Sequence, residues 1–457
     1  MAKPELKVEL EIDETADLLP FFTLDDPVSG VLDNTDYPLG GLQFFDVSEH
    51  VAGFSSSRGI SRELDRTTAG ICSVALNNNL RLFDPLNSAS PFSQQLVPHR
   101  QIRVTANGSA LYLGIVDDWN LQYDLTGNNL SIANGVDKFT LLAQQTLDEI
   151  AVPVELPGPR MERILDRPEV DWSASERNID AGHVPLLAGT VALGTNALEY
   201  LQNIAYTEDG NFFIGNNGDA VLQDGLTGPS TLGLITFSSE NDGIPYTEIE
   251  VVYGSELLYN RVEVSNIEGF TVIGDSLTSQ SLYGITTLTR DNFLADVTEA
   301  AIAVTTLLNR YDEPEYRFER LLVDMTDLSG AYQAQLLGAE LTNVARIKFQ
   351  PNNIGDVIDK YAQIIGIKHS VDAKRHKIEF RFRTLDYAPF VLDDAQFGTL
   401  GGTTDTYLGA TEEIYNDVDT TYDQNNVPYT GTIPNSGITY DDNIQYDGDV
   451  ETGNRLG

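Results

Sequence analysis

The sequence predicts a mainly β protein with α+β insertions, built as two small β-barrel domains plus α/β lobes. Tyr and Phe, which favour strands, number 20 and 19 among 457 residues, and the 38 Gly residues favour many turns. Between Leu42 and Asp124, alternating or apolar runs end in turn residues about every 8 to 12 positions, the spacing of a small barrel or sandwich. Farther along, helix-spaced apolar residues alternate with strand-like runs, which indicates the insertions.

Composition divides the chain into five parts. The first part is rich in turn signals such as Asp-Pro, Ser-Gly and Gly-Gly, and the last is acidic, with Gly, Thr, Asn and Tyr filling much of the rest. The parts are an N-terminal arm (1–40), a first β-barrel (41–135), an α+β lobe with a helix and a hairpin (136–240), a second β-barrel with α+β elements (241–392) and an acidic C-terminal tail (393–457).

Alternation of apolar residues predicts the strands. In the first half they are expected at Leu6–Ile12 and within the runs LQFFDV, AGICSVALNN, LRLFDP, RQIRVTANG, SALYLGIVDDWNLQYD and NNLSIAN. In the second half they are expected within EIEVVYG, NRVEVSN and SLYGITTLT, and over Arg317–Met325 and Ile367–Leu392.

Helical spacing predicts the helices. Lys138–Ile150 is the first, and the three prolines of the following VPVELPGPR end it, before a short helix in ERILDRPEVDW. Thr195–Tyr206 is amphipathic and precedes a hairpin whose turn is rich in Gly and Asn. Two more helices are expected at Leu294–Asn309 and Gly355–Gly366.

The charge of the chain limits the kinds of partner that it can bind. With 28 basic and 69 acidic residues the net charge is −41, so long-range repulsion opposes binding to DNA or to anionic membranes. Three interpretations stay open: a solvated acidic surface, a channel wall that DNA slides past, and a surface that collects divalent cations.

Cysteine content and hydropathy indicate the compartment in which the protein is made. Cys72 is the single cysteine, so no intrachain disulfide can form, and its apolar strand predicts a buried small hydrophobe. No secretory signal is visible, and no apolar run approaches the ~18 residues that span a bilayer. We expect no membrane insertion by this chain, synthesis in a cytoplasm and departure by lysis or within a particle.

The motifs of enzymes and cofactor sites are missing from the sequence. No G-x-S-x-G, HExxH, G-x-G-x-x-G or P-loop motif occurs, and the acid pair Asp117-Asp118 means little among so many acids. His369 and His376 face each other across a predicted hairpin, either as a shared metal site or as ordinary strand residues. A calcium site is conceivable at four clustered acids, without EF-hand spacing: Asp441, Asp442, Asp447 and Asp449. We therefore predict no catalytic, cofactor or metal residue and no enzyme.

Two groups of residues are candidates for interfaces. Arg58, Arg62 and Arg66 stand out in so acidic a chain, and they pair with acids either across a subunit or tube interface or within the chain on a barrel rim. Aromatic anchors are common at interfaces, and tyrosines recur along the acidic tail. The tail is therefore either ordered by a partner or disordered; the tyrosines chosen are Tyr415, Tyr422, Tyr429 and Tyr440.

Several segments resemble one family when they are taken in order. The chain carries SRGISRELDRTTAG with ICSVALNNNLRLFDP, then LYLGIVDDWNLQYD, LEYLQNIAYTEDGNFFIGNNGDAVLQD, NRVEVS, SLYGITTLT and a closing stretch from IIGIKHSVD to FVLDDAQFGTLG. This order is similar to that of the minor tail proteins, or tail-tip hub proteins, of actinobacterial siphophages. The resemblance covers roughly residues 40 to 400, and the acidic tail is not part of the pattern.

The resemblance implies a fold and a function. The fold would be that of phage baseplate hubs, with two β-barrel tube domains and α/β insertions. The protein would be a structural subunit of the virion tail tip, a homotrimeric ring that closes or extends the tail tube and has an acidic lumen through which DNA passes without specific binding. Its partners would be distal tail and tape-measure proteins and other minor tail proteins or fibres.

Two other functions stay open at this point. A carbohydrate-binding adhesin at the tail tip would need exposed aromatic residues on barrel loops, and the chain has only two tryptophans, Trp119 and Trp172. A glycoside or peptidoglycan hydrolase would need a catalytic pair that the motifs do not supply.

Overall fold

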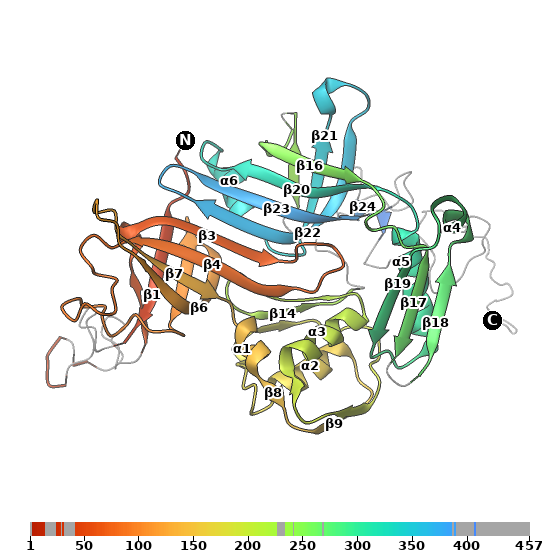
Figure 1. Ribbon diagram of the computed structural model, residues 1–457, viewed down its shortest axis with the longest axis horizontal. Coiled ribbons are helices and arrows are strands. Elements are labelled where there is room, and N and C mark those ends of the chain that lie inside the picture. Colours follow the sequence, from red (N-terminus) through yellow and green to blue (C-terminus); the bar gives the residue numbers. More distant parts are fainter. Residues whose placement is uncertain are drawn as a thin grey trace, which may run out of the picture.

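The computed structural model describes residues 2–13, 24–28, 30–31, 42–225, 234–240, 242–266, 269–385, 388–389 and 406–407. Strands dominate, and one large sheet carries two smaller α/β lobes (Figure 1). The predicted class, mainly β with α+β insertions, is therefore confirmed. Within these residues no helix combines the length and apolar character needed to cross a membrane.

The central sheet has 13 strands, and it joins the regions that were assigned to two barrels. From one edge to the other the order is β16-β20-β23-β22-β3-β4-β7-β6-β5-β1-β2, with β21 and β15 branching from β22. Its strands are β1 (Leu6–Ile12), β2 (Gln43–Asp46), β3 (Val51–Gly59), β4 (Thr68–Asn77), β5 (Gln101–Ala106), β6 (Ser109–Gln122), β7 (Leu130–Val136), β15 (Ile235–Ser238), β16 (Glu248–Tyr253), β20 (Tyr316–Asp324), β21 (Val344–Phe349), β22 (Ile358–Val371) and β23 (His376–Leu385).

The two halves of the sheet meet where β3 pairs antiparallel with β22, and we call this pairing the seam. It runs from Gly59 opposite Gly366 to Phe54 opposite Val371. At Gly59 the backbone has φ 98°, and a Cβ atom there would lie 2.2 Å from the carbonyl oxygen of Ile365. Only glycine allows the two backbones to approach so closely.

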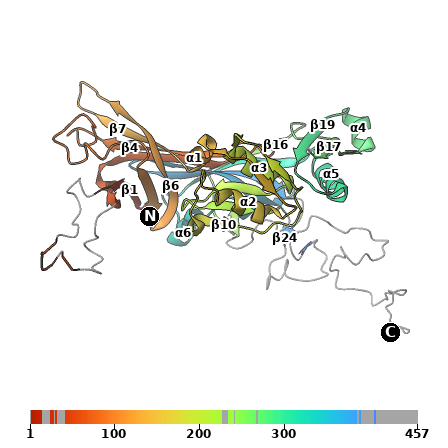
Figure 2. The same ribbon diagram turned by 90° about the horizontal axis from the view of Figure 1, so that it is seen from below.

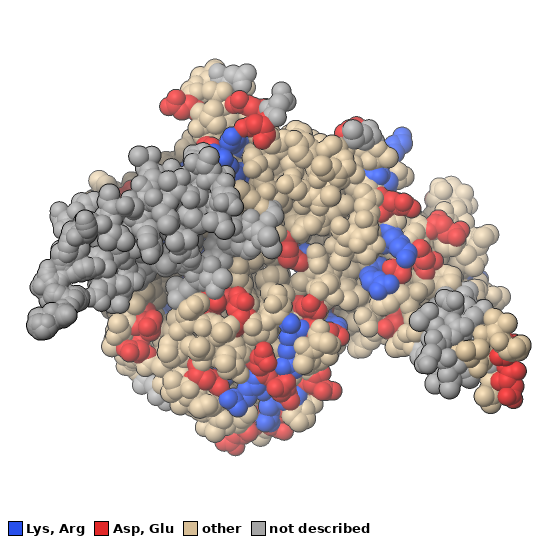
Figure 3. All heavy atoms as spheres, turned by 180° about the vertical axis from the view of Figure 1, so that it is seen from behind, with Lys and Arg blue, Asp and Glu red and all other residues tan. Residues whose placement is uncertain are grey.

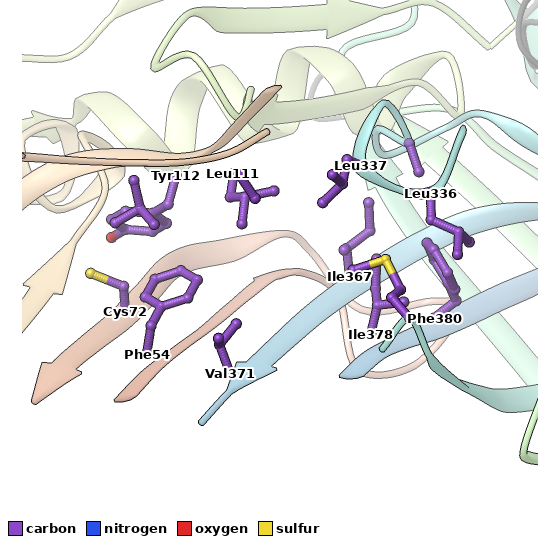
Figure 4. Close-up of a cluster of buried hydrophobic side chains, with 14 of the residues drawn as sticks. Phe54, Cys72, Leu111, Tyr112, Leu336, Leu337, Ile367, Val371, Ile378 and Phe380 are labelled. Atoms are coloured by element: carbon purple, nitrogen blue, oxygen red, sulfur yellow. The ribbon is translucent and has the colours of Figure 1, made fainter. Parts of the chain in front are cut away.

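A single hydrophobic core extends under both halves. Alternate residues of β3, β4, β22 and β23 point to one side, as the period of a strand requires. There Phe54 and Ile367 face Leu111 of β6 and Leu337 of helix α6 (Gly330–Leu337) (Figure 4). In Figure 2, α6 and the N-terminus lie on one side of the sheet. The opposite side of these strands carries the polar residues.

The first lobe follows β7. Helix α3 begins at Ala197 because the Asn196 side chain accepts the backbone N–H of Glu199, and its apolar face packs on a hairpin. The elements are α1 (Phe139–Gln144), β8 (Thr146–Leu147), β9 (Ile150–Val152), α2 (Pro157–Leu165), β10 (Arg177–Ile179), β11 (Gly189–Val191), β12 (Thr195–Asn196), α3 (Ala197–Thr207), β13 (Asn211–Ile214) and β14 (Ala220–Gln223).

The second lobe is a three-stranded sheet with one face covered by a helix. Val262 and Val264 of the middle strand pack under Ala300, Val304 and other apolar residues of α5. The lobe comprises β17 (Arg261–Asn266), β18 (Thr271–Asp275), α4 (Leu277–Tyr283), β19 (Thr287–Asn292) and α5 (Val297–Tyr311). The remaining elements are the 3-10 turns η2 (Ser48–His50), η3 (Ala174–Glu176) and η4 (Pro351–Asn353) and the short strands β24 (Ala388–Pro389) and β25 (Thr406–Tyr407).

The predicted helix at Gly355–Gly366 is wrong, because strand β22 begins at Ile358 and takes up most of this stretch. It pairs with β21 and β23, and residues 361–367 are all buried, so side chains on both faces of the strand are covered. A short apolar run that is buried all round has no period that separates strand from helix. The β-branched residues Ile364, Ile365 and Ile367 favour the strand.

Three other element predictions need correction. LRLFDP forms turns instead of a strand, because the Asn78 side chain accepts the backbone N–H of Phe83. SLYGITTLT ends helix α4 before its strand begins at Thr287, since Asn260 holds the turn by accepting the backbone N–H of Thr286. The first helix is short, and the prolines of VPVELPGPR start α2 at Pro157, where a missing N–H costs nothing.

Candidate assembly surfaces

Eight strands of the central sheet run alternately up and down. Every neighbouring pair along β16-β20-β23-β22-β3-β4-β7-β6 is antiparallel. The two outer strands of this set, β16 and β6, are separated by seven antiparallel steps and therefore run in opposite directions.

Both outer strands have an edge without a strand partner in the described part of the chain. β16 pairs with β20 alone. β6 is 14 residues long, and β5 pairs with it only from Ser109 to Ile115, so residues 117–122 pair with β7 alone. An exposed strand edge presents backbone N–H and C=O groups that a strand of another chain can pair with. We call these two segments the free edges.

The side of the sheet away from the core, which we call the open face, carries a row of hydroxyl and amide groups. Ser370, Ser55, Ser73 and Asn134 are successive partners across four strands. Ser73 Oγ donates to Asn134 Oδ1 over 3.1 Å, and Asn134 Nδ2 donates to Asp118 Oδ1 over 3.0 Å. The row ends at a free edge.

Charged residues flank this row in mixed sign. Arg320 bonds Glu250 and Glu379 on the two neighbouring strands, at 3.2 and 3.3 Å. Lys368 lies opposite Glu379 in the strand register. Figure 3 shows acidic and basic groups side by side on the first lobe as well, where Arg163 bonds Glu155. Basic side chains of the open face therefore lie beside acids.

The three arginines predicted from the sequence lie at the junction of the sheet with the two lobes. Arg58 is buried, with its guanidinium 2.7 Å from Glu340 Oε1 and donating to the carbonyl of Ile214 over 3.2 Å. It therefore ties the seam to the hairpin of the first lobe. Arg58 therefore makes an intrachain ion pair, and an interface role for it stays a prediction.

Arg62 and Arg66 lie on the exposed loop 60–67 that follows the seam. Arg62 pairs with Glu256 at 3.4 Å, and both side chains are more than half exposed. Arg66 lies over the ring of Tyr206 with 5.0 Å to its centroid. Both are accessible, so an interface role for them stays a prediction.

Asp209 is a functional candidate that sequence reasoning missed. Its carboxylate lies 3.0 Å from Arg290 Nη1 on β19, 2.8 Å from Arg310 Nη1 on α5 and 3.7 Å from Arg383 Nη1 on β23. Burial opposes its ionisation, but the three guanidinium groups outweigh burial and hold the pKa of Asp209 below its usual range. The sequence shows only an Asp-Gly turn, and residues up to 174 positions apart meet there through folding.

The remaining residues singled out from the sequence form no metal site in the described part of the chain. His369 and His376 are buried and joined by a hydrogen bond of 3.1 Å between Nδ1 and Nε2. No group of three or more His, Cys, Asp or Glu in the described residues has the geometry of a metal site. Cys72 is buried, as predicted. The tail tyrosines, from Tyr415 to Tyr440, and the acids of the calcium hypothesis lie outside the described residues.

Neither tryptophan is an exposed loop residue. The indole N–H of Trp172 donates to the carbonyl of Glu176, and its side chain belongs to the core of the first lobe. Trp119 lies on β6 and packs against the main core. The aromatic platform that the adhesin alternative needs is therefore not supplied by tryptophan.

Comparison with solved structures finds this fold in tail proteins. The tail protein from Neisseria meningitidis MC58 matches 75% of this chain and 94% of its own, with a TM-score of 0.54 and 11% identity. The 43 kDa tail protein of prophage MuSo2 from Shewanella oneidensis matches 82% of this chain and 98% of its own, with a TM-score of 0.51 and 12% identity. By sequence, no family model and no curated protein matches the chain.

These matches establish the fold of the chain. At 11 and 12% identity the likeness extends over most of both chains, so this chain has the fold of phage tail proteins. The likeness carries over no residue role. The free edges and the open face are properties of this chain itself.

Proposed function

We propose that the chain is a structural subunit of a phage tail tip, and that three copies form a hub ring that closes or extends the tail tube. The observation that carries this proposal is the pair of free edges at opposite ends of eight alternating strands. The tail-protein fold supports the same conclusion.

The ring would form by pairing β16 of one copy with residues 117–122 of the next. Because β16 and β6 run in opposite directions within a copy, a neighbour brought up by rotation continues the antiparallel pattern without reversal. Such a head-to-tail contact closes into a ring when the rotation fits a whole number of copies. Pairing would also satisfy edges that would otherwise invite aggregation.

The open face would line the lumen. Hydroxyl and amide groups contact phosphates weakly, and the basic residues Arg320 and Lys368 have acidic neighbours on adjacent strands. With a net charge of −41 for the whole chain, DNA would pass without being held. The negative potential of the lumen inferred from the sequence would then come from the net charge of all subunits of the ring. The uncharged row of serines would contribute little to it.

In this role the protein is part of the virion and has no catalytic task. The lobes and the loop 60–67 would dock distal tail, tape-measure and other minor tail proteins or fibres. Synthesis in the host cytoplasm belongs to the same proposal.

The test combines assembly with hydrogen exchange on the full chain. Light scattering and negative-stain imaging should give a trimer with a central hole. As the trimer forms, amides in 117–122 and 248–253 should gain protection, while those of β20, already paired on both sides, stay constant. A monomer at every concentration, or a trimer whose two edges still exchange freely, would contradict the proposal.

A further inference from the structure

Strand β16, the first of the two free edges, has one apolar side and one acidic side. Ile249 and Val251 are half-buried and pack against the main core. Glu248 and Glu250 are exposed on the open face, where both pair with Arg320. The strand therefore presents apolar side chains to a neighbour on one side of the sheet and carboxylates on the other.

The second free edge, residues 117–122 of β6, alternates with the same period. Trp119 packs against the main core, and Leu121 points to the same side two positions later and is half-buried. Asp118 lies on the open face, where its carboxylate accepts a side-chain amide of β7. Asn120 and Gln122 follow on that side, and both are exposed. This edge therefore carries amides as well as an acid on its polar side.

The two sides of the sheet restrict how these edges can pair between copies. In an antiparallel pair, residues directly opposite each other point to the same side of the sheet. A shift by one residue would turn the core side of one copy towards the open face of the next. The alignments that keep Ile249 and Val251 on the side of Trp119 therefore differ from one another by even numbers of residues.

One of these alignments sets an amide opposite each acid of β16. When Asn120 lies opposite Glu250, Gln122 lies opposite Glu248, because the two strands run antiparallel. Each amide can donate an N–H to the carboxylate across from it. A carboxylate has enough lone pairs to accept Arg320 at the same time.

The neighbouring alignments set acid against acid. A shift of two residues in one direction brings Asp118 opposite Glu250. A shift of two in the other direction brings Asp124, just past the end of β6, opposite Glu248. Like charges directly opposite each other destabilise a strand pair. Side-chain charge therefore selects the alignment between these two.

We propose that copies of this chain pair in this single register, with Glu250 of one copy opposite Asn120 of the next. Apolar pairs then close the core side of the joint: Ile249 opposite Leu121, and Val251 opposite Trp119. Pairs of an aromatic with a β-branched residue are among those that stabilise neighbouring strands. The inference rests on the proposed ring and adds its register, which the free edges alone leave open.

Disulfide formation between introduced cysteines measures the register on the full chain. Directly opposite residues have Cα atoms about 4.5 to 5.5 Å apart, which a disulfide spans, whereas residues offset by two lie about 7 to 8 Å apart. Under mild oxidation, Ile249→Cys combined with Leu121→Cys should give covalent trimers. Val251→Cys with Leu121→Cys, and Ile249→Cys with Trp119→Cys, are the matched offset pairs and should give monomers on a denaturing gel.

These positions leave every acid of the two edges in place, so the charges still select the register. The single variant Ile249→Cys is the control for the native thiol, since Cys72 is buried. It should give no covalent product. Circular dichroism checks that each variant folds.

Two charge variants test the same register without cysteines. Asn120→Asp sets an acid opposite Glu250, and Gln122→Glu sets one opposite Glu248. Each should raise the concentration at half assembly, measured by light scattering, about two- to fivefold. In either shifted register, one of these two variants has no acid opposite it. Asn128→Asp on the turn after β6 is the control, with a change of less than about 1.5-fold.

The outcomes separate the register from the ring itself. A disulfide in the direct pair, with weaker assembly of both charge variants, supports the inference. A disulfide in an offset pair, weakening by only one charge variant, or protected edges without a disulfide in the direct pair overturns the register and leaves the ring standing. Edges that exchange freely, with no disulfide in any pair, contradict the ring and overturn the register with it.

Discussion

The seam and the Asp209 junction join parts of this molecule by different means. At the seam, backbone groups of β3 and β22 pair along six register positions, and a glycine at Gly59 lets the strands approach. At the junction, arginines from β19, α5 and β23 converge on one carboxylate. The first connection depends on backbone shape, and the second depends on one charge.

This difference says where the molecule tolerates change. The stability of a backbone seam does not depend on side-chain charge, but the pairing is lost when a single atom is added between the strands. A charge junction keeps its shape when one group is neutralised, but it leaves buried cations without a partner. The following variants separate these two kinds of failure.

The largest effect is expected for Gly59→Ala. The added Cβ would meet the Ile365 carbonyl oxygen at 2.2 Å, and the backbone there has positive φ. We expect a loss of at least about 3 kcal/mol in the free energy of unfolding, measured by urea denaturation. Gly108→Ala is the control, because Gly108 also has positive φ but its Cβ meets nothing within 4 Å. Equal losses of stability at the two sites would mean that backbone strain at positive φ causes the loss, and that the clash with the Ile365 carbonyl adds nothing.

Asp209→Asn should be nearly as damaging for a different reason. The side chain keeps its size and the residue keeps its tolerance of the positive φ found there, but Arg290, Arg310 and Arg383 lose their anion. Because the Asp209 side chain is 29% exposed, solvent offsets part of the cost, and we expect a loss of about 2 to 3 kcal/mol. Calorimetry checks this, and a variant as stable as wild type would show that solvent already compensates the three arginines.

The histidine pair beside the seam should make stability depend on pH. Burial lowers the pKa of His369 well below its usual value and that of His376 to about 4. Because the unfolded chain binds these protons more readily, stability is complete above about pH 6.5 and falls as pH decreases towards 4. The loss over this window should be about 2 to 3 kcal/mol from His376 alone, and His369 adds to it in the same direction.

The measurement is the difference between wild type and a chain with His369→Gln and His376→Gln. A difference is needed because burial raises the pKa of Asp137 and of Glu208 to about 7, and these acids change stability in the opposite direction over the same window. If the difference between the two chains does not change between pH 7 and pH 4, the pair has no such role.

The smallest effect is expected for Arg320→Gln on the open face. Its ion pairs with Glu248, Glu250 and Glu379 are partly exposed, so solvent screens them. We expect a loss of about 0.5 to 1 kcal/mol that shrinks further in 0.5 M salt. A loss of stability as large as that of Asp209→Asn would contradict the expectation that ion pairs at the junction stabilise the fold more than those at the surface.

Much of the fold was accessible from sequence patterns. Alternation identified β1, β4 and β20, and helical spacing followed by a Gly- and Asn-rich turn identified α3 and its hairpin. The pattern failed at Gly355–Gly366, where a strand buried by neighbours on both sides resembles a helix. It also failed at LRLFDP, where the Asn78 side chain accepts the backbone N–H of Phe83 and the run forms turns.

The candidate site divides in the same way. The arginines 58, 62 and 66 were conspicuous because basic residues are rare in this chain. Their surroundings could not be predicted from the sequence, since Arg58 is buried against Glu340 while Arg62 lies at the surface. Nothing in the sequence marks Asp209 or Arg290, because neither lies in a motif.

The sequence by itself determined the β class, the presence of α+β insertions and the excess of negative charge, because these follow from local periodicity and composition. Only the tertiary structure decided that the two β regions share one sheet and that β16 and β6 keep free edges. The same holds for the convergence of three distant arginines on Asp209. Each of these depends on pairings between residues far apart in the chain, and no local pattern encodes such pairings.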